Sequence, residues 1–193
     1  GGVHPDIAPD TLAISSYALG LDNTGLYYDE APVDEIIERI EIKAKQILTD
    51  AALSLSRFKG KIIPYASKAS SEITEALANQ AAKHNVAFEV GITVSSPGFY
   101  GPSSRFIEGL KNTFPDIKGS LSKLEVDGLR VLNMEMESSL FFHLCSQMGY
   151  RAGTICTVIS ASTSSDDVVD YDAAIGNTIQ IGLKTLVDLN KTN

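Results

Sequence analysis

Residues 133–140, with the sequence NMEMESSL, decide how this chain is interpreted. They stand between a short apolar strand predicted over residues 129–132 and an apolar run, residues 140–144, that is typical of a helix. A junction that follows the C-terminal end of a parallel strand opens into the crevice where α/β proteins bind ligands. We therefore expect Glu135 and Glu137 to lie at the binding edge of a sheet.

The two carboxylates suit a ligand that offers hydroxyl groups. An ionised carboxylate only accepts hydrogen bonds, so one such group can hold two adjacent donors such as the vicinal hydroxyls of a sugar. Met136, between them, offers adaptable apolar contact for the carbon face of the sugar. The alternative is that both acids are simply favoured near a helix N-terminus, where backbone N–H groups are exposed. The pattern by itself leaves both interpretations open.

Composition narrows the class of protein. The 193 residues fit one domain, residues 1–193, and the net charge of −8 with no run of basic residues argues against a nucleic-acid surface. No apolar stretch is long enough to span a bilayer, so no membrane partner is expected. Cys145 and Cys156 lie in apolar segments, which is typical of reduced, buried thiols in a cytosolic protein. No histidine has metal-ligand spacing, so no metal is expected.

Strands and helices are predicted to alternate along the chain. The predicted strands cover residues 11–19, 61–65, 86–94, 129–132 and 152–159. The predicted helices begin at Asp34, at Ser70 or Ser71, at residue 106 (ending at 114), at residue 140 and near Asp170, the last with Ile175, Ile179, Leu183 and Leu186 on one face. Residues 119–128 are expected to form a helical or turning connection. This alternation favours an α/β fold, a mostly parallel sheet with helices on both faces.

A second feature points to the same edge of the sheet. The predicted strand over residues 86–94 runs directly into residues 95–102 (SSPGFYGP), whose two prolines and two glycines exclude regular structure. A buried strand that ends in a rigid, aromatic loop is typical of a binding site. Phe99 could instead close the end of the sheet, and Arg105 could be a solvated surface group.

Three stretches, taken together, resemble the uridine phosphorylase branch of the nucleoside phosphorylase family. They are residues 91–102 (GITVSSPGFYGP), 133–139 (NMEMESS) and 151–159 (RAGTICTVI), and the opening residues 1–7 (GGVHPDI) also resemble a segment of that family. The resemblance covers essentially the whole chain in order. It implies a three-layer αβα phosphorylase-like fold and, as activity, cleavage of a nucleoside by inorganic phosphate to a free base and ribose 1-phosphate.

The resemblance also implies roles for individual residues. Glu137 would bind the ribose hydroxyls with support from Glu135, and Met136 would pack under the sugar. Phe99 would lie against sugar and base, and Arg105 would bind the polar edge of the pyrimidine. Two further positions, Ser103 and Ile159, would line the base pocket. Arg105 suits a departing base that gains negative charge, because its guanidinium remains protonated and donates in a fixed plane.

The chain also departs from the family pattern. The family carries its phosphate loop and phosphate-binding arginines upstream of the segment matched by Gly1, so we expect this chain to be the C-terminal part of a longer protein. Ser103 stands where uridine phosphorylases usually carry a glutamine that pairs with uracil. Ala161 and Ser162 replace their Asn-Arg pair, and Asp166 or Asp167 would substitute only if that loop is rearranged; capping and solvation is their ordinary role.

The expected function is therefore pyrimidine nucleoside phosphorolysis by a cytoplasmic pentosyltransferase of nucleoside catabolism and pyrimidine salvage. The expected small molecules are the nucleoside and phosphate as co-substrate, without a further cofactor. A homo-oligomer is expected because the family is oligomeric and because unpaired central strands would expose backbone groups. The alternatives are a hydrolytic nucleosidase and a catalytically impaired subunit that binds a nucleoside or another protein.

Overall fold

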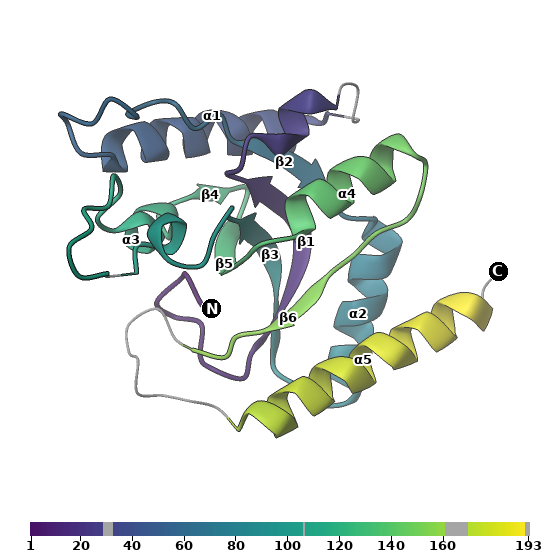
Figure 1. The fold of residues 1–193 in the computed structure, drawn as a ribbon. Helices are drawn as coiled ribbons and strands as arrows, with labels where there is room; N and C mark the ends of the chain where they lie inside the picture. Colours follow the sequence, from purple (N-terminus) through teal and green to yellow (C-terminus); the bar gives the residue numbers. More distant parts are fainter. Residues whose placement is uncertain (29–32, 106, 161–169, 192–193) are drawn as a thin grey trace.

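A mixed β-sheet forms the centre of the molecule (Figure 1). The computed structural model describes residues 1–28, 33–105, 107–160 and 170–191. Within these residues the strands are β1 (Leu12–Gly20), β2 (Tyr65–Lys68), β3 (Phe88–Ser95), β4 (Glu125–Val126), β5 (Leu129–Glu135) and β6 (Ile155–Thr157). The α-helices are α1 (Glu35–Ala51), α2 (Ser71–Lys83), α3 (Ile117–Leu121), α4 (Ser138–Gln147) and α5 (Tyr171–Lys191), with short 3-10 turns at Thr24–Tyr27 and Gly101–Ser103.

The parallel part of the sheet consists of its inner strands. Within the order β2-β1-β3-β5-β4, the pairs β1–β3 and β3–β5 are parallel. The outer strands are antiparallel: β2 and β6 share one edge of β1, and β4 pairs with β5. The predicted α/β fold with a mostly parallel central sheet is confirmed. The parallel strands are the apolar ones, as expected for strands covered on both faces.

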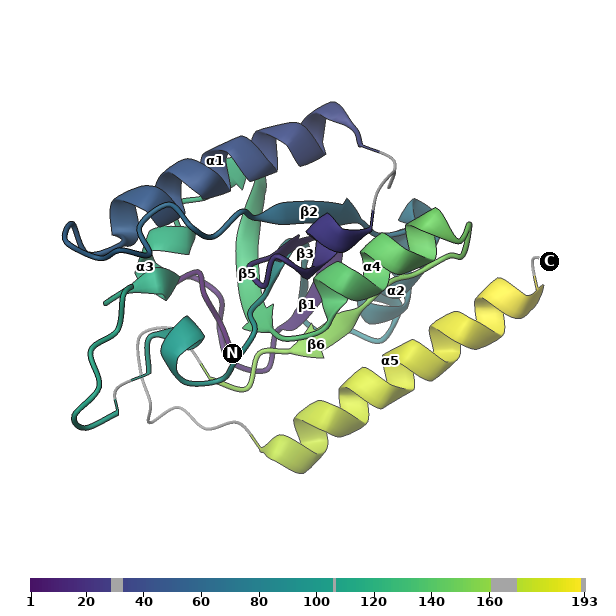
Figure 2. The ribbon, with the colours of Figure 1, turned by 45° about the horizontal axis from the view of Figure 1, so that its top comes forward.

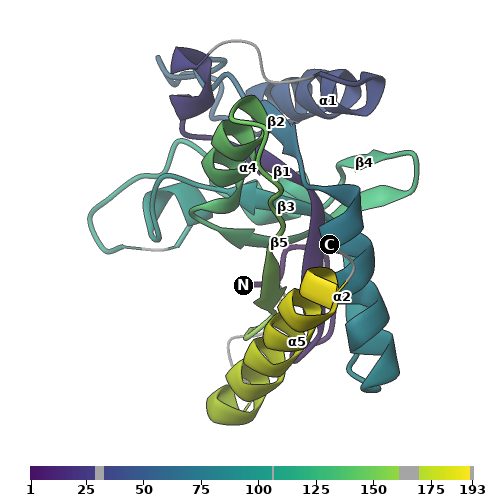
Figure 3. The ribbon, with the colours of Figure 1, turned by 90° about the vertical axis from the view of Figure 1, so that its right-hand side faces the viewer.

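Helices cover both faces of this sheet. Leu19 and Ala18 are neighbours on β1 and therefore point to opposite faces. Leu19 belongs to the large core that includes α1 and α3, whereas Ala18 packs with Phe142 of α4. The helices α2 and α5 pack on one another and on the N-terminal half of β1. Figure 2 shows α1 along one side of the sheet, and Figure 3 shows α2 and α5 side by side away from α1.

Several predicted elements are placed differently by the structure. The strand expected over 61–65 begins only at Tyr65 and continues to Lys68, because Pro64 delays pairing with β1. The helix expected over residues 106–114 is wrong where the structure describes it: residues 107–114 are irregular, with a turn at residues 108–109 and Gly109 at a φ of 79°. The strand expected over 152–159 is limited to β6 and runs antiparallel to β1.

Two helix predictions were more accurate. Asp34 is the N-cap of α1, its side chain accepting a hydrogen bond from Ile37 N. Ser70 is the N-cap residue of α2, but its hydroxyl accepts from Ala152 N instead of capping the helix.

The last helix is where it was predicted, but the face it buries is not the one with the predicted apolar residues. Ala174, Ile181 and Thr185 are buried, while Ile179, Leu183 and Leu186 are exposed. No described helix is both long enough and apolar enough to cross a membrane. Cys145 and Cys156, predicted to be buried, are free and partly buried.

Candidate functional site

The candidate site begins where two parallel strands end side by side. Ser95, the last residue of β3, is in register with Glu135, the last residue of β5, and Ser96 N donates to Glu135 O at 2.9 Å. The loop that follows β3 and the junction that follows β5 therefore start from adjacent points. This is the carboxyl edge where open α/β sheets bind ligands.

The carboxylate of Glu135 holds the junction together. Its Oε1 accepts a 2.5 Å hydrogen bond from Ser95 Oγ. Its Oε2 accepts from Glu137 N, from Ser138 N and from Ser138 Oγ, each at 2.9 Å. Four donors thus converge on this group from the end of β3 and the start of α4. Glu135 fixes the direction in which the next two residues leave the strand.

Glu137 has the opposite environment. It is exposed, it occupies the N-cap position of α4, and its Oε2 accepts a 3.1 Å hydrogen bond from Met136 N. Within the described part of the chain its Oε1 has no protein donor. Met136 beside it is 46% exposed. The two acids of the motif are therefore distinct: one is bound by the protein, and the other presents an open acceptor.

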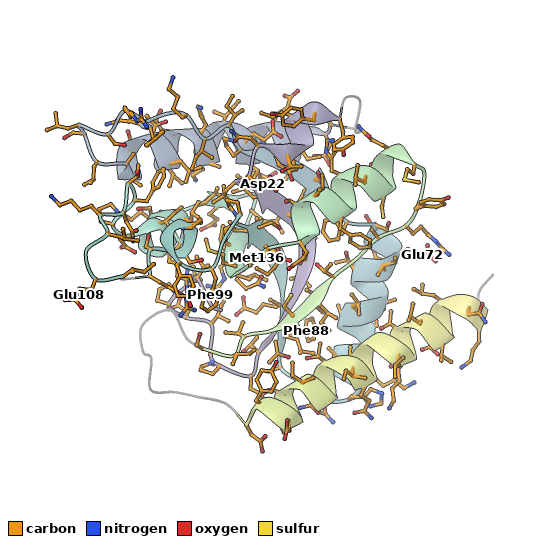
Figure 4. All side chains as sticks on the ribbon, viewed as in Figure 1. Asp22, Glu72, Phe88, Phe99, Glu108 and Met136 are labelled. Carbon is orange, nitrogen blue, oxygen red and sulfur yellow. The ribbon has the colours of Figure 1, made fainter. Side chains whose placement is uncertain are left out.

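Phe99 and Arg105 come together on the loop after β3. Arg105 Cζ lies 3.9 Å from the centroid of the Phe99 ring, and the ring is 53% exposed. The loop closes on itself through Arg105 N, which donates to Tyr100 O at 2.9 Å. Figure 4 shows Phe99 and Met136 on neighbouring segments at the same end of the sheet, far from Glu72. The loop thus carries a stacked aromatic and cation beside the acidic junction.

Ser104 anchors this loop to the rest of the molecule. Its backbone is left-handed, with φ of 54°. Its hydroxyl donates to Phe114 O at 2.6 Å and accepts from Ile117 N at 3.0 Å. Arg105 therefore starts from a fixed backbone position.

Ser103 lies on the loop after β3, whereas Ile159 follows β6, whose end pairs with the N-terminal end of β1. The hydroxyl of Ser103 lies 3.4 Å from Gly98 O and 3.5 Å from Met134 Sδ, so it is turned back onto its own loop and β5. Ile159 is half-buried after β6, next to Ser160, whose carbonyl accepts from Gly2 N at 2.9 Å. Ala161, Ser162, Asp166 and Asp167 lie outside the described residues.

A lysine that sequence reasoning missed adds positive charge here. Lys118, on α3, lines a hollow of about 410 Å³ together with Ser103 and Asp116. Burial lowers the pKa of its ammonium, and the neighbouring Arg105 guanidinium lowers it further. This pair of cations favours an electron-rich ligand at the edge. Nothing in the local sequence distinguishes Lys118 from other surface lysines.

Ser95 and Ser138 were also missed as partners of Glu135. The sequence could have indicated both residues, because Ser95 stands at the end of a predicted strand and Ser138 three residues after Glu135.

The thiol of Cys156 lies near this site. Burial raises the pKa of this thiol to about 11, and the charge of Glu135 also raises it. The described residues contain no cluster of His, Cys, Asp and Glu that could hold a metal ion.

The sheet and the residues at its carboxyl edge define an α/β protein with a candidate ligand site after β3 and β5. The family model described as the phosphorylase superfamily matches residues 1–187, and the chain belongs to that family.

Two uridine phosphorylases are similar to this chain in sequence, and a solved nucleoside phosphorylase is similar to it in fold. The uridine phosphorylase of Haemophilus influenzae is 32% identical over 143 residues, 73% of this chain and 55% of that protein. The uridine phosphorylase of Thermococcus kodakarensis is 34% identical over 107 residues, 54% of this chain and 36% of that protein. A Trypanosoma brucei nucleoside phosphorylase, described as showing uridine phosphorylase activity, has a TM-score of 0.82 and 28% identity, over 97% of this chain and 61% of that one. The matched parts of the chain thus span between 36% and 61% of the length of these proteins.

Proposed function

We propose that this chain belongs to a pentosyltransferase that cleaves a pyrimidine nucleoside, uridine-like, with inorganic phosphate. The products would be the free base and ribose 1-phosphate. The observation that carries the proposal is that an open carboxylate, Glu137, and a stacked aromatic–guanidinium pair, Phe99 and Arg105, stand on loops that leave adjacent parallel strands. Similarity to uridine phosphorylases supports the same reaction.

The ribose would be held by the acidic junction. Glu137 would accept hydrogen bonds from two vicinal hydroxyls through its exposed carboxylate, because an ionised carboxylate is an acceptor only. Met136 would cover the carbon face of the sugar. Glu135 would act by orientation, since its carboxylate is already bound by four donors of the protein. In this proposal Glu137 binds the sugar and Glu135 positions the residues around it.

The base would lie against the loop after β3. Phe99 would pack on its face, and Arg105 would stabilise the negative charge that develops on the departing base, an effect that preorganised cations supply. Ser103 and Ile159 would line the base pocket from the side. Ser103 offers a single hydroxyl that can rotate, whereas a glutamine amide has a fixed donor and a fixed acceptor. We therefore expect weaker selectivity for the pyrimidine than a glutamine would give.

Phosphate would be the only co-substrate, with no further cofactor. Residues 1–193 would act as one domain in the cytoplasm, in nucleoside catabolism and pyrimidine salvage, as part of a homo-oligomer. The exposed apolar residues of α5 support a homo-oligomer, because contiguous exposed apolar surface is typical of interaction sites.

Product analysis with uridine tests this function directly. The chain is incubated with uridine, with and without phosphate, and uracil and ribose 1-phosphate are measured. Ribose 1-phosphate that appears only with phosphate supports the proposal. Uracil release without phosphate would instead identify a hydrolytic nucleosidase. Binding without turnover would identify an impaired nucleoside-binding subunit.

A Glu137→Ala variant tests the ribose assignment separately. Uridine affinity, measured by calorimetry, should fall by about tenfold or more, since a hydrogen bond to a charged group is worth about 1.5–3 kcal/mol. Glu108→Ala is the matched control, because Glu108 is an exposed acid on the far side of the loop (Figure 4). Unchanged affinity in Glu137→Ala would remove this residue from the site.

A further inference from the structure

A second hollow lies behind the loop that carries Phe99 and Arg105. Its volume is about 480 Å³, within the range of small-molecule sites. Four segments enclose it: the turn after β1, the connection between α1 and β2, the loop after β3, and residues 111–117. Its lining residues are Leu21, Asn23, Phe58, Lys61, Ile62, Pro97, Gly101, Pro102, Lys111, Asn112, Thr113, Phe114 and Ile117. Phe99, Arg105 and Glu137 are not among them, so this hollow is separate from the proposed nucleoside site.

The inner part of the hollow is apolar and can hold a flat ring. Leu21 and Ile117 are 4% and 1% exposed and form its floor. Phe58, 51% exposed, stands at the rim with the guanidinium of Arg57 stacked 4.6 Å from its ring centroid. An aromatic ligand could therefore pack on the floor and against Phe58.

The rim is positively charged in a protein of net charge −8. Lys61 and Lys111 are both exposed lining residues, and neither ammonium has a hydrogen-bond or ion-pair partner among the described residues. The lining contains no acidic side chain among the residues that the structure describes. Lys61 and Lys111 thus give the lining of an apolar hollow two positive charges, a pattern that complements an anion, and Arg57 stands behind Phe58.

Another apolar hollow, beside α5, differs in charge from the hollow lined by Lys61 and Lys111. That hollow, about 450 Å³, is lined by Phe141, Leu183 and Leu186, and Arg151 is the charged residue in its described lining. Arg151 Nη1 already donates to Glu72 Oε2 at 2.8 Å. A ligand with a negative charge therefore gains more beside Lys61 and Lys111 than beside α5.

The hollow shares its wall with the proposed base-binding loop. Pro97, Gly101 and Pro102 line it from that loop. On the opposite wall, Asn112 Nδ2 donates to Arg105 O at 3.4 Å, and Phe114 O accepts from Ser104 Oγ. A molecule in the hollow would thus contact both the loop and the segment to which the loop is anchored.

We propose that this hollow binds an aromatic anion, a flat apolar ring that bears a sulfonate, carboxylate or phosphate group. The ring packs on Leu21, Ile117 and Phe58, and the anionic group lies between Lys61 and Lys111. The ligand would contact Pro97, Gly101 and Pro102, which belong to the loop that carries Arg105. Such a ligand therefore holds that loop in place.

The probe for the test is 8-anilinonaphthalene-1-sulfonate, an aromatic anion that fluoresces when bound in an apolar site. The chain contains no tryptophan, so Phe58→Trp places a single indole donor at the rim of the hollow. Phe141→Trp is the matched control, because Phe141 is 46% exposed and lines the hollow beside α5. We expect the bound probe to quench the Phe58→Trp emission more strongly than the Phe141→Trp emission. Equal or stronger quenching in Phe141→Trp would overturn the proposal.

Charge dependence is measured with the same probe. The Lys61→Gln/Lys111→Gln variant should bind it about fivefold more weakly, a size typical of two exposed charge interactions. Lys83→Gln/Lys123→Gln, which removes two exposed lysines outside the lining, should bind as the parent does. The neutral analogue N-phenyl-1-naphthylamine should bind the parent more weakly than the sulfonate does. Equal binding by parent and Lys61→Gln/Lys111→Gln, or equal affinity for the neutral analogue, would exclude an anion site.

Discussion

Two carboxylates one residue apart have different tasks in this protein. Glu135 is the final residue of β5, and its side chain points to donors of β3 and α4. Glu137 is in the non-helical turn before α4 and is exposed. In a strand, side chains two positions apart point to the same face. Because β5 ends at Glu135, Glu137 no longer follows this rule and has a different environment.

We expect alanine substitutions of Glu135 and Glu137 to change the free energy of unfolding by different amounts. Glu135→Ala should lower the free energy of unfolding by about 2–3 kcal/mol, because it leaves buried hydroxyl and backbone donors without an acceptor. Glu137→Ala should change it by less than about 0.5 kcal/mol, as is usual for an exposed position. Urea denaturation followed by circular dichroism measures both. Similar losses in the two variants would contradict the assignment of Glu135 as the anchor.

The second prediction concerns Cys156. Because burial raises the pKa of its thiol to about 11, the thiol remains protonated at pH 8 and only the thiolate reacts. In a Cys145→Ser background, iodoacetamide should label Cys156 slowly at pH 8 and faster as the pH rises toward 11. Intact mass spectrometry at several pH values follows the labelling. Rapid modification of the folded protein at pH 8 would contradict this prediction.

At the scale of elements, the start of α1 depends on one aspartate. Asp34 Oδ1 accepts from Ile37 N at 2.9 Å, and its Oδ2 accepts from Tyr17 Oη at 3.1 Å and Lys68 Nζ at 3.0 Å. One side chain thus caps the helix and ties it to β1 and β2. Burial opposes ionisation, but these hydrogen bonds, that from Ile37 first, lower the pKa of Asp34 overall.

The third prediction follows from that cap. Asp34→Ala should destabilise the protein by about 1–2 kcal/mol, the usual cost of a lost N-cap, and Asp34→Asn should cost less because the amide oxygen still accepts. A carboxyl whose pKa is lowered by folding stabilises above its unfolded pKa, near 3.8, and this contribution is lost as the pH falls through the folded pKa. The stability difference between parent and Asp34→Asn should therefore shrink below about pH 4. Chemical denaturation at pH 3 and pH 7 measures it; a constant difference would contradict the role of the charge.

At the scale of the whole molecule, the sheet and its helices leave one helix face uncovered. Leu183, Leu186 and Val187 of α5 are 59%, 64% and 55% exposed. Leu183 and Leu186 line the hollow that also includes Phe141. A second copy of the chain would remove this apolar surface from water, which is the main driving force for association.

The fourth prediction tests association through α5. The parent should have a mass above the 20.7 kDa of one chain in light scattering after gel filtration. Leu183→Lys/Leu186→Lys should shift it toward that value, because buried charges in an apolar interface are costly. Leu55→Lys, at a 98% exposed position outside α5, is the control and should leave the mass unchanged. A monomeric parent would contradict the proposed homo-oligomer.

The positions of the main strands and helices could be predicted because their signals are local. The apolar run before residue 95, the helical period after Asp34 and the junction at residues 133–140 are visible in the sequence, and the structure contains β3, α1, β5 and α4 there. The strand over residues 61–65 and the helix over residues 106–114 were misplaced because local propensity is weaker than pairing and turn geometry.

Local patterns in the sequence were enough to predict an α/β chain with a mostly parallel sheet, and to place acidic and aromatic residues directly after strands. Hydrophobic period and turn residues are sufficient for this, since they act within a few positions. The packed fold was needed to show that β3 and β5 are neighbours, that Glu135 is held by Ser95 and Ser138, and that β6 runs antiparallel to β1. It was also needed to show that Lys61 and Lys111 share a hollow with Leu21. These facts depend on contacts between residues far apart in the chain, and their geometry is set by how the elements pack.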